Sequence, residues 1–301
     1  MKLAANLSLL YEHLPWPDRF AAAANDGFRF VEILFPYEHP PDWYARQLQA
    51  HGLTLVLVNT PVTTTFPLGL AAQPGAQHEF RRQFARVLAI CEATGCPAVH
   101  VMAGPRVDSL VPSQQRAVLL DNLTWITDLP QAPRAQLEAL NAIDVPGYFY
   151  HTPLEALGVL QAHLSRCSPP SPPAQWLAHA PHDGNPDRPC DSAGDTAAHL
   201  PAWSPVRSGV GLQFDFYHTV KQGLSLPQQL VSALPLVQHV QVAGSPQRQE
   251  PELARELIEG FRLLHEFGYR GFVGCEYRPR DPDTTRPDWA TPLIANTWLS
   301  F

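Results

Sequence analysis

The feature that most constrains this chain is the regular alternation of short apolar segments with longer, helix-like ones. Eight of the apolar segments are too short for helices, and several are rich in Val, Ile and Phe, which is typical of buried strands. They are Leu3–Leu9, Arg29–Phe35, Leu53–Asn59, Ala98–Ala103, Ala135–Leu140, Val210–Phe216, Val237–Ala243 and Gly271–Tyr277. Strands that alternate with helices predict a parallel sheet.

Helix-like segments separate these strands, and several of them stop just before a glycine, as helices often do. Ser113 predicts the N-cap of one of these helices. The segments are Asp18–Asn25, Asp42–Ala50, Gln77–Thr94, Ser113–Asp128, Thr152–Leu164, Leu226–Ala233 and Pro251–Phe267. Eight strands favour a closed (β/α)8 TIM barrel over the alternative, an open doubly wound sheet. No strand is followed by the Gly-x-Gly-x-x-Gly motif expected if an open sheet bound a dinucleotide.

One segment, 165–208, interrupts this rhythm. It is dense in Pro, Ser, Ala and Asp, includes SPPSPPAQ and APHDGNPDRP, and has little periodicity. We interpret it as a long insertion loop between the fifth and sixth βα units, either dispensable or a lid. The chain of 301 residues suits a single barrel domain over 1–301. The tail 278–301, with Trp289 and Trp298, is expected to pack on the barrel.

Composition narrows the class of protein. A hydrophobic fraction of 45% supports a sizeable core, and a net charge of -7 with no basic block argues against a nucleic-acid partner. No apolar run approaches the ~20 residues of a membrane span, and the start of the chain lacks a signal peptide, so a cytoplasmic protein is expected. The five cysteines include no Cys-x-x-Cys pair, which predicts reduced thiols rather than a disulfide framework or a thiolate zinc site.

Oxygen-bearing side chains occupy the ends of the last four predicted strands. Glu138, Asp215, Gln241 and Glu276 each lie near the end of an apolar run, and the carboxyl ends of barrel strands carry catalytic groups. Taken alone, each of these residues could equally be a salt-bridged residue at the rim of the barrel. Three converging carboxylates are costly unless a cation compensates them. With the amide they form a set of hard oxygen donors, which predicts Mg²⁺ or Mn²⁺.

Other polar residues near the strand ends are candidates for substrate contact: Asn59, His100, His218 and His239. His239 has the same strand parity as Gln241, so the two should face the same side. Each histidine can equally be a buried side chain with one good hydrogen bond.

Six blocks of sequence resemble the hydroxypyruvate isomerase family of the xylose isomerase-like barrel superfamily. They occur in the family's order over nearly the whole chain except the insertion. The blocks are AANLSLL at 4–10, GFRFVEILFPYE at 27–38, LEALNAIDVPGY at 137–148, LQFDFYH at 212–218, HVQVA at 239–243 and GCEYRP at 274–279.

The resemblance implies roles for the same four residues that the strand ends indicate. Glu138 and Glu276 match metal ligands that also transfer protons, and Asp215 and Gln241 match metal ligands. It implies conversion of hydroxypyruvate to tartronate semialdehyde through an enediolate, with a divalent metal ion and a small-molecule substrate. It also allows a homo-oligomer.

Two departures from the family concern positions that contact substrate or support the site. After the seventh strand the chain has AGSPQRQEPELARE at 243–256, where relatives carry a stretch resembling ADNPHRGEPGTGE, and Val58 replaces a histidine before Asn59. Two alternatives therefore stay open: an epimerase or isomerase of another sugar or sugar acid, or a metal-binding barrel with altered or lost activity. Arg248 or Arg278 could bind a substrate carboxylate, or either could be a solvated surface arginine.

Overall fold

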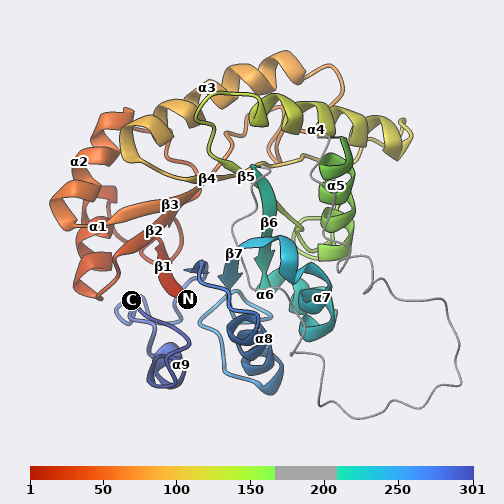
Figure 1. Ribbon diagram of the computed structural model, residues 1–301. Coiled ribbons are helices and arrows are strands. Elements are labelled where there is room, and N and C mark those ends of the chain that lie inside the picture. Colours follow the sequence, from red (N-terminus) through yellow and green to blue (C-terminus); the bar gives the residue numbers. More distant parts are fainter. Residues whose placement is uncertain (167–208) are drawn as a thin grey trace, which may run out of the picture.

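The computed structural model describes residues 1–166 and 209–301. Its eight strands, all parallel to their neighbours, form a closed barrel in chain order, with β1 hydrogen-bonded to both β2 and β8 (Figure 1). The strands are β1 (Lys2–Asn6), β2 (Phe30–Ile33), β3 (Thr54–Asn59), β4 (Ala98–His100), β5 (Arg134–Glu138), β6 (Val210–Asp215), β7 (Val237–Val242) and β8 (Phe272–Cys275). The predicted barrel and all eight strands are confirmed.

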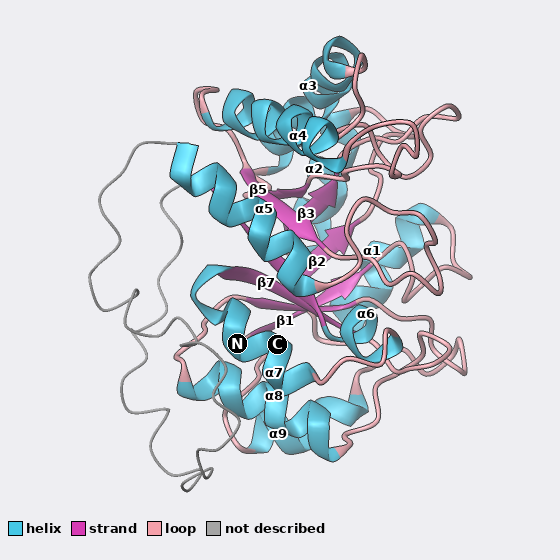
Figure 2. Cartoon of the chain, turned by 90° about the vertical axis from the view of Figure 1, so that its right-hand side faces the viewer, coloured by secondary structure: helices cyan, strands magenta, loops and turns pink. Residues whose placement is uncertain are grey.

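Helices surround the barrel, as the two views show together (Figures 1 and 2). They are α1 (Trp16–Asn25), α2 (Pro41–His51), α3 (Gln77–Thr94), α4 (Pro112–Thr127), α5 (Pro153–Arg166), α6 (Phe216–Lys221), α7 (Leu226–Ala233), α8 (Arg255–Glu266) and α9 (Thr291–Ala295), with 3-10 turns at Leu234–Leu236 and Asp288–Ala290. In the described parts of the chain, no helix has both the length and the apolar character needed to cross a bilayer.

Three predicted details need correction. Ser113 is not an N-cap, because α4 begins one residue earlier at Pro112 and Val111 occupies the cap position. A proline is favoured at the first helical position because it has no N–H to leave unpaired. The strand predicted over Val210–Phe216 ends at Asp215, and the short helix α6 that follows was not predicted. Pro251–Ala254 precede α8 rather than beginning it.

The predicted position of the insertion agrees with the order of the elements, because the predicted insertion lies between α5 and β6. Apart from its first two residues, the predicted insertion 165–208 lies outside the described residues. The tail packs on the barrel as expected. Ser300 forms a bridge with Lys2, and the ring of Phe301 lies 5.5 Å from that of Phe28.

Strands β6 and β7 are buried along their whole length, yet both carry polar residues among their apolar ones. Because strand side chains point to opposite faces in turn, Gln213 and Asp215 share one face, and His239 and Gln241 share one face of β7. Phe214, on the other face, packs against Phe216 at the start of α6. The Phe214 face of β6 therefore meets the helices, and the face with Gln213, Asp215, His239 and Gln241 fills the barrel interior below the site.

Candidate active site

A pocket of about 240 Å³ opens at the carboxyl ends of the strands. Its polar lining comes from Asn59, His100, Glu138, His218, Arg248 and Glu276, and Arg278 lies among the remaining residues, which are mostly apolar. The pocket thus sits where barrels place catalytic groups. A cavity of this size holds a small metabolite rather than a polymer.

Three carboxylates lie buried at this end of the barrel: Glu138 on β5, Asp215 on β6 and Glu276 just after β8. Burial raises the pKa of all three, because a charged carboxylate loses its hydration. For Glu138 the neighbouring charges of Glu276 and Asp215 raise the pKa further. For Glu276 burial raises the pKa to about 8, although Arg248 lowers it. The three groups therefore titrate as an interacting set.

Arg248 provides the positive charge at this cluster. Its Nη2 lies 2.9 Å from Oε2 of Glu276 and 3.4 Å from Oδ2 of Asp215. Burial by itself would lower the pKa of Arg248, but Glu276 and Asp215 outweigh it and raise that pKa. The loop after β7 presents this side chain from a residue with a φ of 58°. The sequence left Arg248 open between a substrate contact and a surface arginine, and the structure places it in the pocket.

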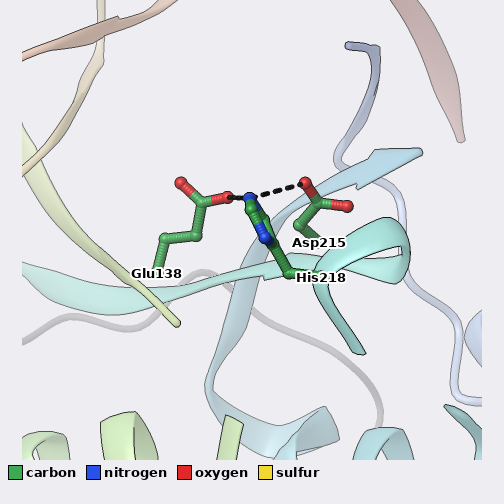
Figure 3. A group of neighbouring side chains, drawn as sticks. All are labelled: Glu138, Asp215 and His218. Atoms are coloured by element: carbon green, nitrogen blue, oxygen red, sulfur yellow. Dashed lines mark ion pairs between the residues drawn. The ribbon is translucent and has the colours of Figure 1, made fainter. Parts of the chain in front are cut away.

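His218 follows the cluster on α6, and its ring orientation is fixed by Asn141. The backbone N–H of Asn141 donates to Nδ1 of His218 at 3.1 Å. Nη1 of Arg248, which can only donate, lies 3.2 Å from the other ring nitrogen, Nε2. That nitrogen lies 3.6 Å from Oδ2 of Asp215 and 3.8 Å from Oε1 of Glu138 (Figure 3). Burial, followed by the charge of Arg248, lowers the pKa of His218, so the ring is neutral. Its Nε2 faces the site.

Gln241 joins the cluster from β7, and both ends of its amide are hydrogen-bonded. Its Nε2 donates to Oε2 of Glu32 at 2.8 Å, and its Oε1 accepts from Nε2 of Gln213 at 2.6 Å. The same Gln213 nitrogen also donates to Oε2 of Glu138 at 2.7 Å. The amide oxygen of Gln241 is therefore turned toward the side of the barrel that carries Glu138.

These donors fit a divalent cation. Glu138, Asp215 and His218 each offer an atom within 4.8 Å of the others. Arg248, which contacts Asp215, also contacts the carboxylate of Glu276. Oε1 of Glu138 is buried without a hydrogen-bond partner among the described residues. An oxygen-rich, buried set with raised carboxyl pKa values is stabilised by a hard cation such as Mg²⁺ or Mn²⁺.

The predicted substrate contacts divide into two groups. Asn59 and His100, on the neighbouring strands β3 and β4, line the pocket with His218. Nδ1 of His100 lies 3.1 Å from Oε2 of Glu138 but makes no hydrogen bond there, and burial lowers the pKa of His100 to about 3. His239 is not among the pocket residues. Its Nε2 lies 2.5 Å from Oε1 of Glu32, so its predicted substrate contact gains no support from the geometry.

Three residues that were not predicted as site residues hold the site in place. Glu32 and Gln213 together fix Gln241. Asn141 fixes His218 from the loop after β5. Asp215 also caps α6, since its Oδ1 accepts the Tyr217 N–H at 2.6 Å. An aspartate at the end of an apolar run is a signal for such a cap.

Comparison with known proteins agrees with this fold. Residues 20–167 match the model of the xylose isomerase-like TIM barrel family. The chain is 33% identical to the "Putative hydroxypyruvate isomerase" of Homo sapiens, covering 96% of this chain and 94% of that protein. It is 31% identical to the 2-oxo-tetronate isomerase of Cupriavidus necator, covering 97% and 98% respectively.

A solved structure shares the fold over almost the full length. The crystal structure of "AP endonuclease, family 2" from Brucella melitensis superimposes with a TM-score of 0.76 at 30% identity, covering 97% of this chain and 98% of that one. The sequence blocks, the closed barrel and these similarities agree. The chain therefore belongs to the hydroxypyruvate isomerase family of xylose isomerase-like TIM barrels, a family of isomerases.

Proposed function

We propose that this protein is a metal-dependent isomerase that converts hydroxypyruvate to tartronate semialdehyde, with Glu138 and Glu276 moving the proton. The observation that carries this proposal is that both glutamates line one small pocket, together with the cation Arg248. Removing and returning a proton on adjacent carbons requires two such groups beside one substrate.

Glu138, Asp215, Gln241 and Glu276 are the residues that would hold the metal ion. A divalent cation bound there would supply positive charge that stabilises the negative charge developing on the substrate oxygens. Because Gln241 Nε2 already donates to Glu32, only its oxygen is available for this purpose.

The proton transfers are assigned to the two glutamates. One carboxylate accepts a proton from the hydroxymethyl carbon of hydroxypyruvate, which leaves an enediolate. The other glutamate delivers a proton to the neighbouring carbon, and the hydroxyl proton moves to the former carbonyl oxygen, so that an aldehyde and a secondary alcohol result. Burial keeps the pKa of both glutamates above the ordinary range, which suits groups that accept and return protons near neutral pH.

Other pocket residues bind and orient the substrate. His218, held by Asn141 with Nε2 toward the carboxylates, is placed to contact a substrate oxygen. Arg248 and Arg278 are the cations that line the pocket and can bind the substrate carboxylate.

A second candidate substrate is the four-carbon acid 2-oxo-tetronate. Asn59 Oδ1 and both ring nitrogens of His100 are buried without a hydrogen-bond partner among the described residues, and both side chains line the pocket. Buried polar atoms normally find partners, and an additional substrate hydroxyl would provide one. The identity to a 2-oxo-tetronate isomerase is compatible with this candidate.

Metal removal and a pair of substrates test the proposal. Protein stripped with a chelator and then restored with Mn²⁺ would be incubated separately with hydroxypyruvate and 2-oxo-tetronate, and the products followed by NMR. We expect conversion of hydroxypyruvate only in the restored sample. Conversion of the four-carbon acid alone would favour the second candidate. Turnover unaffected by stripping, or none with Mn²⁺ bound, would contradict the proposal.

A further inference from the structure

We infer that Glu32 is a positioning residue that fixes the amide of Gln241 so that its oxygen, and not its nitrogen, faces the metal-binding carboxylates. This inference rests on the metal site of the proposed function. Glu32 lies on β2, across the barrel from Gln241 on β7, and is 1% exposed.

Both carboxylate oxygens of Glu32 lie against side-chain nitrogens. Oε2 accepts from Nε2 of Gln241 at 2.8 Å and from Nδ2 of Asn6 at 3.2 Å. Oε1 lies 2.5 Å from Nε2 of His239. The two amide nitrogens can only donate, so Oε2 is held as an acceptor. The group of Gln241 that faces Glu32 must therefore be its NH2, which turns the amide oxygen the other way.

On that other side the orientation is completed by Gln213. Its Nε2 donates one hydrogen to Oε1 of Gln241 and one to Oε2 of Glu138. Four side chains thus form a hydrogen-bonded chain across the barrel, from Glu32 through Gln241 and Gln213 to Glu138. Glu32 at one end orients two of the residues that would hold the metal, without reaching the pocket itself.

The backbone of β8 makes room for this arrangement. A Cβ at Gly274 would lie 2.1 Å from Oε1 of Glu32, so this carboxylate occupies space that only a glycine leaves free. Gly274 pairs with Gln241 in the β7–β8 register. Glycines within strands often mark a position where another group approaches the backbone closely, and here that group is the carboxylate of Glu32.

Metal affinity tests this role directly. Groups that orient metal ligands change metal affinity by about 10- to 100-fold when they are altered. We expect Glu32→Gln to weaken Mn²⁺ binding, measured by calorimetry, by a factor in that range, because a glutamine can present an N–H where Gln241 requires an acceptor. Glu32→Asp keeps the charge but shortens the reach, and we expect a smaller loss. It also serves as the test variant if Glu32→Gln does not fold.

A double-mutant cycle separates positioning from general damage. In a Gln241→Ala background, Glu32→Gln should cause little further loss of Mn²⁺ affinity, because the ligand that it orients is already gone. Asn6→Ser is the matched control: it removes a donor to Glu32 without touching Gln241, and should leave affinity within a few-fold of wild type.

Each outcome has a separate meaning. Equal losses from Glu32→Gln in both backgrounds, or unchanged Mn²⁺ affinity in the folded Glu32 variants, would overturn the inference while leaving the proposed function in place. Wild-type protein that binds no Mn²⁺ would contradict the proposed metal site instead.

Discussion

The guanidinium of Arg248 holds Glu276 at two points. Nη2 lies 2.9 Å from the carboxylate Oε2, and Nε donates to the backbone carbonyl of the same residue at 3.1 Å. A planar guanidinium that contacts both the side chain and the main chain fixes the position of a carboxylate as well as its charge. Arg248 therefore orients one of the two proposed proton-transfer groups.

Replacing this arginine should impair turnover much more than replacing an exposed one. We expect Arg248→Gln to lower kcat/KM by about 100-fold, the typical effect of removing a preorganised charged donor from an active site. Arg280→Gln is the control, since Arg280 is exposed and pairs with Glu252 away from the pocket. Steady-state kinetics of both variants with hydroxypyruvate would check this. Similar losses in the two would show that Arg248 has no special role.

The buried carboxylates predict that the metal-free protein becomes less stable as the pH rises. Burial raises the pKa of Glu276 from its ordinary value of 4.5 to about 8, so the folded state retains a proton that the unfolded chain has released. The free energy of unfolding that this proton contributes therefore decreases as the pH rises from 4.5 to about 8. The lowered pKa values of His100 and His218 act in the opposite direction, but only below about 6.5.

Calorimetry of stripped protein at pH 6.5 and pH 8 isolates the carboxylate effect. The wild-type Tm should be lower at pH 8, and the difference should shrink in Glu276→Gln, which cannot ionise. A Tm that rises toward pH 8, or an equal difference in the variant, would show that the raised pKa of Glu276 does not govern stability.

Two glycine substitutions should act in opposite directions. Gly274→Ala would place a methyl group 2.1 Å from Oε1 of Glu32, and overpacking of this kind costs about 1–3 kcal/mol. Gly158→Ala, within α5, meets nothing closer than 3.9 Å and should stabilise the protein by roughly 0.5–1 kcal/mol. Urea unfolding of each variant measures both effects. Equal free energies of unfolding for the two variants would show that a methyl group at position 274 causes no steric clash.

Asn59 should matter more for a four-carbon substrate than for hydroxypyruvate. Its Oδ1 has no partner among the described residues and lies in the pocket lining. Asn59→Leu removes this acceptor at nearly constant size, and one neutral hydrogen bond of about 1 kcal/mol corresponds to about a fivefold change. We expect kcat/KM to fall by that factor for 2-oxo-tetronate and to change less for hydroxypyruvate. Equal losses for both would remove the reason to assign Asn59 to an additional hydroxyl.

The sequence predicted the barrel because strand and helix patterns are local. Each strand is a short apolar run, and α3 and α7 have the predicted boundaries. The local pattern also predicted that Glu138 and Asp215 lie close together, since the carboxyl ends of parallel strands meet at one rim of the barrel. The short helix α6 was missed because its six residues are too few to show a helical period.

Contacts across the barrel could not be predicted in the same way. Glu32 and Gln241 are separated by 209 positions, and their contact depends on the register of every strand between them. Arg248 lies on a loop whose path is set by tertiary contacts rather than by periodicity, so the sequence could not decide between a pocket residue and a surface one.

Exchange with solvent deuterium tests whether the two glutamates transfer the proton. Wild type, Glu138→Gln and Glu276→Gln, each supplied with Mn²⁺, would be incubated with hydroxypyruvate in deuterated water, and deuterium incorporation and product would be followed by NMR. We expect deuterated tartronate semialdehyde from the wild type and loss of turnover by at least about 100-fold in both variants, the scale of a general acid or base. Near wild-type turnover in either variant would contradict the two-glutamate mechanism.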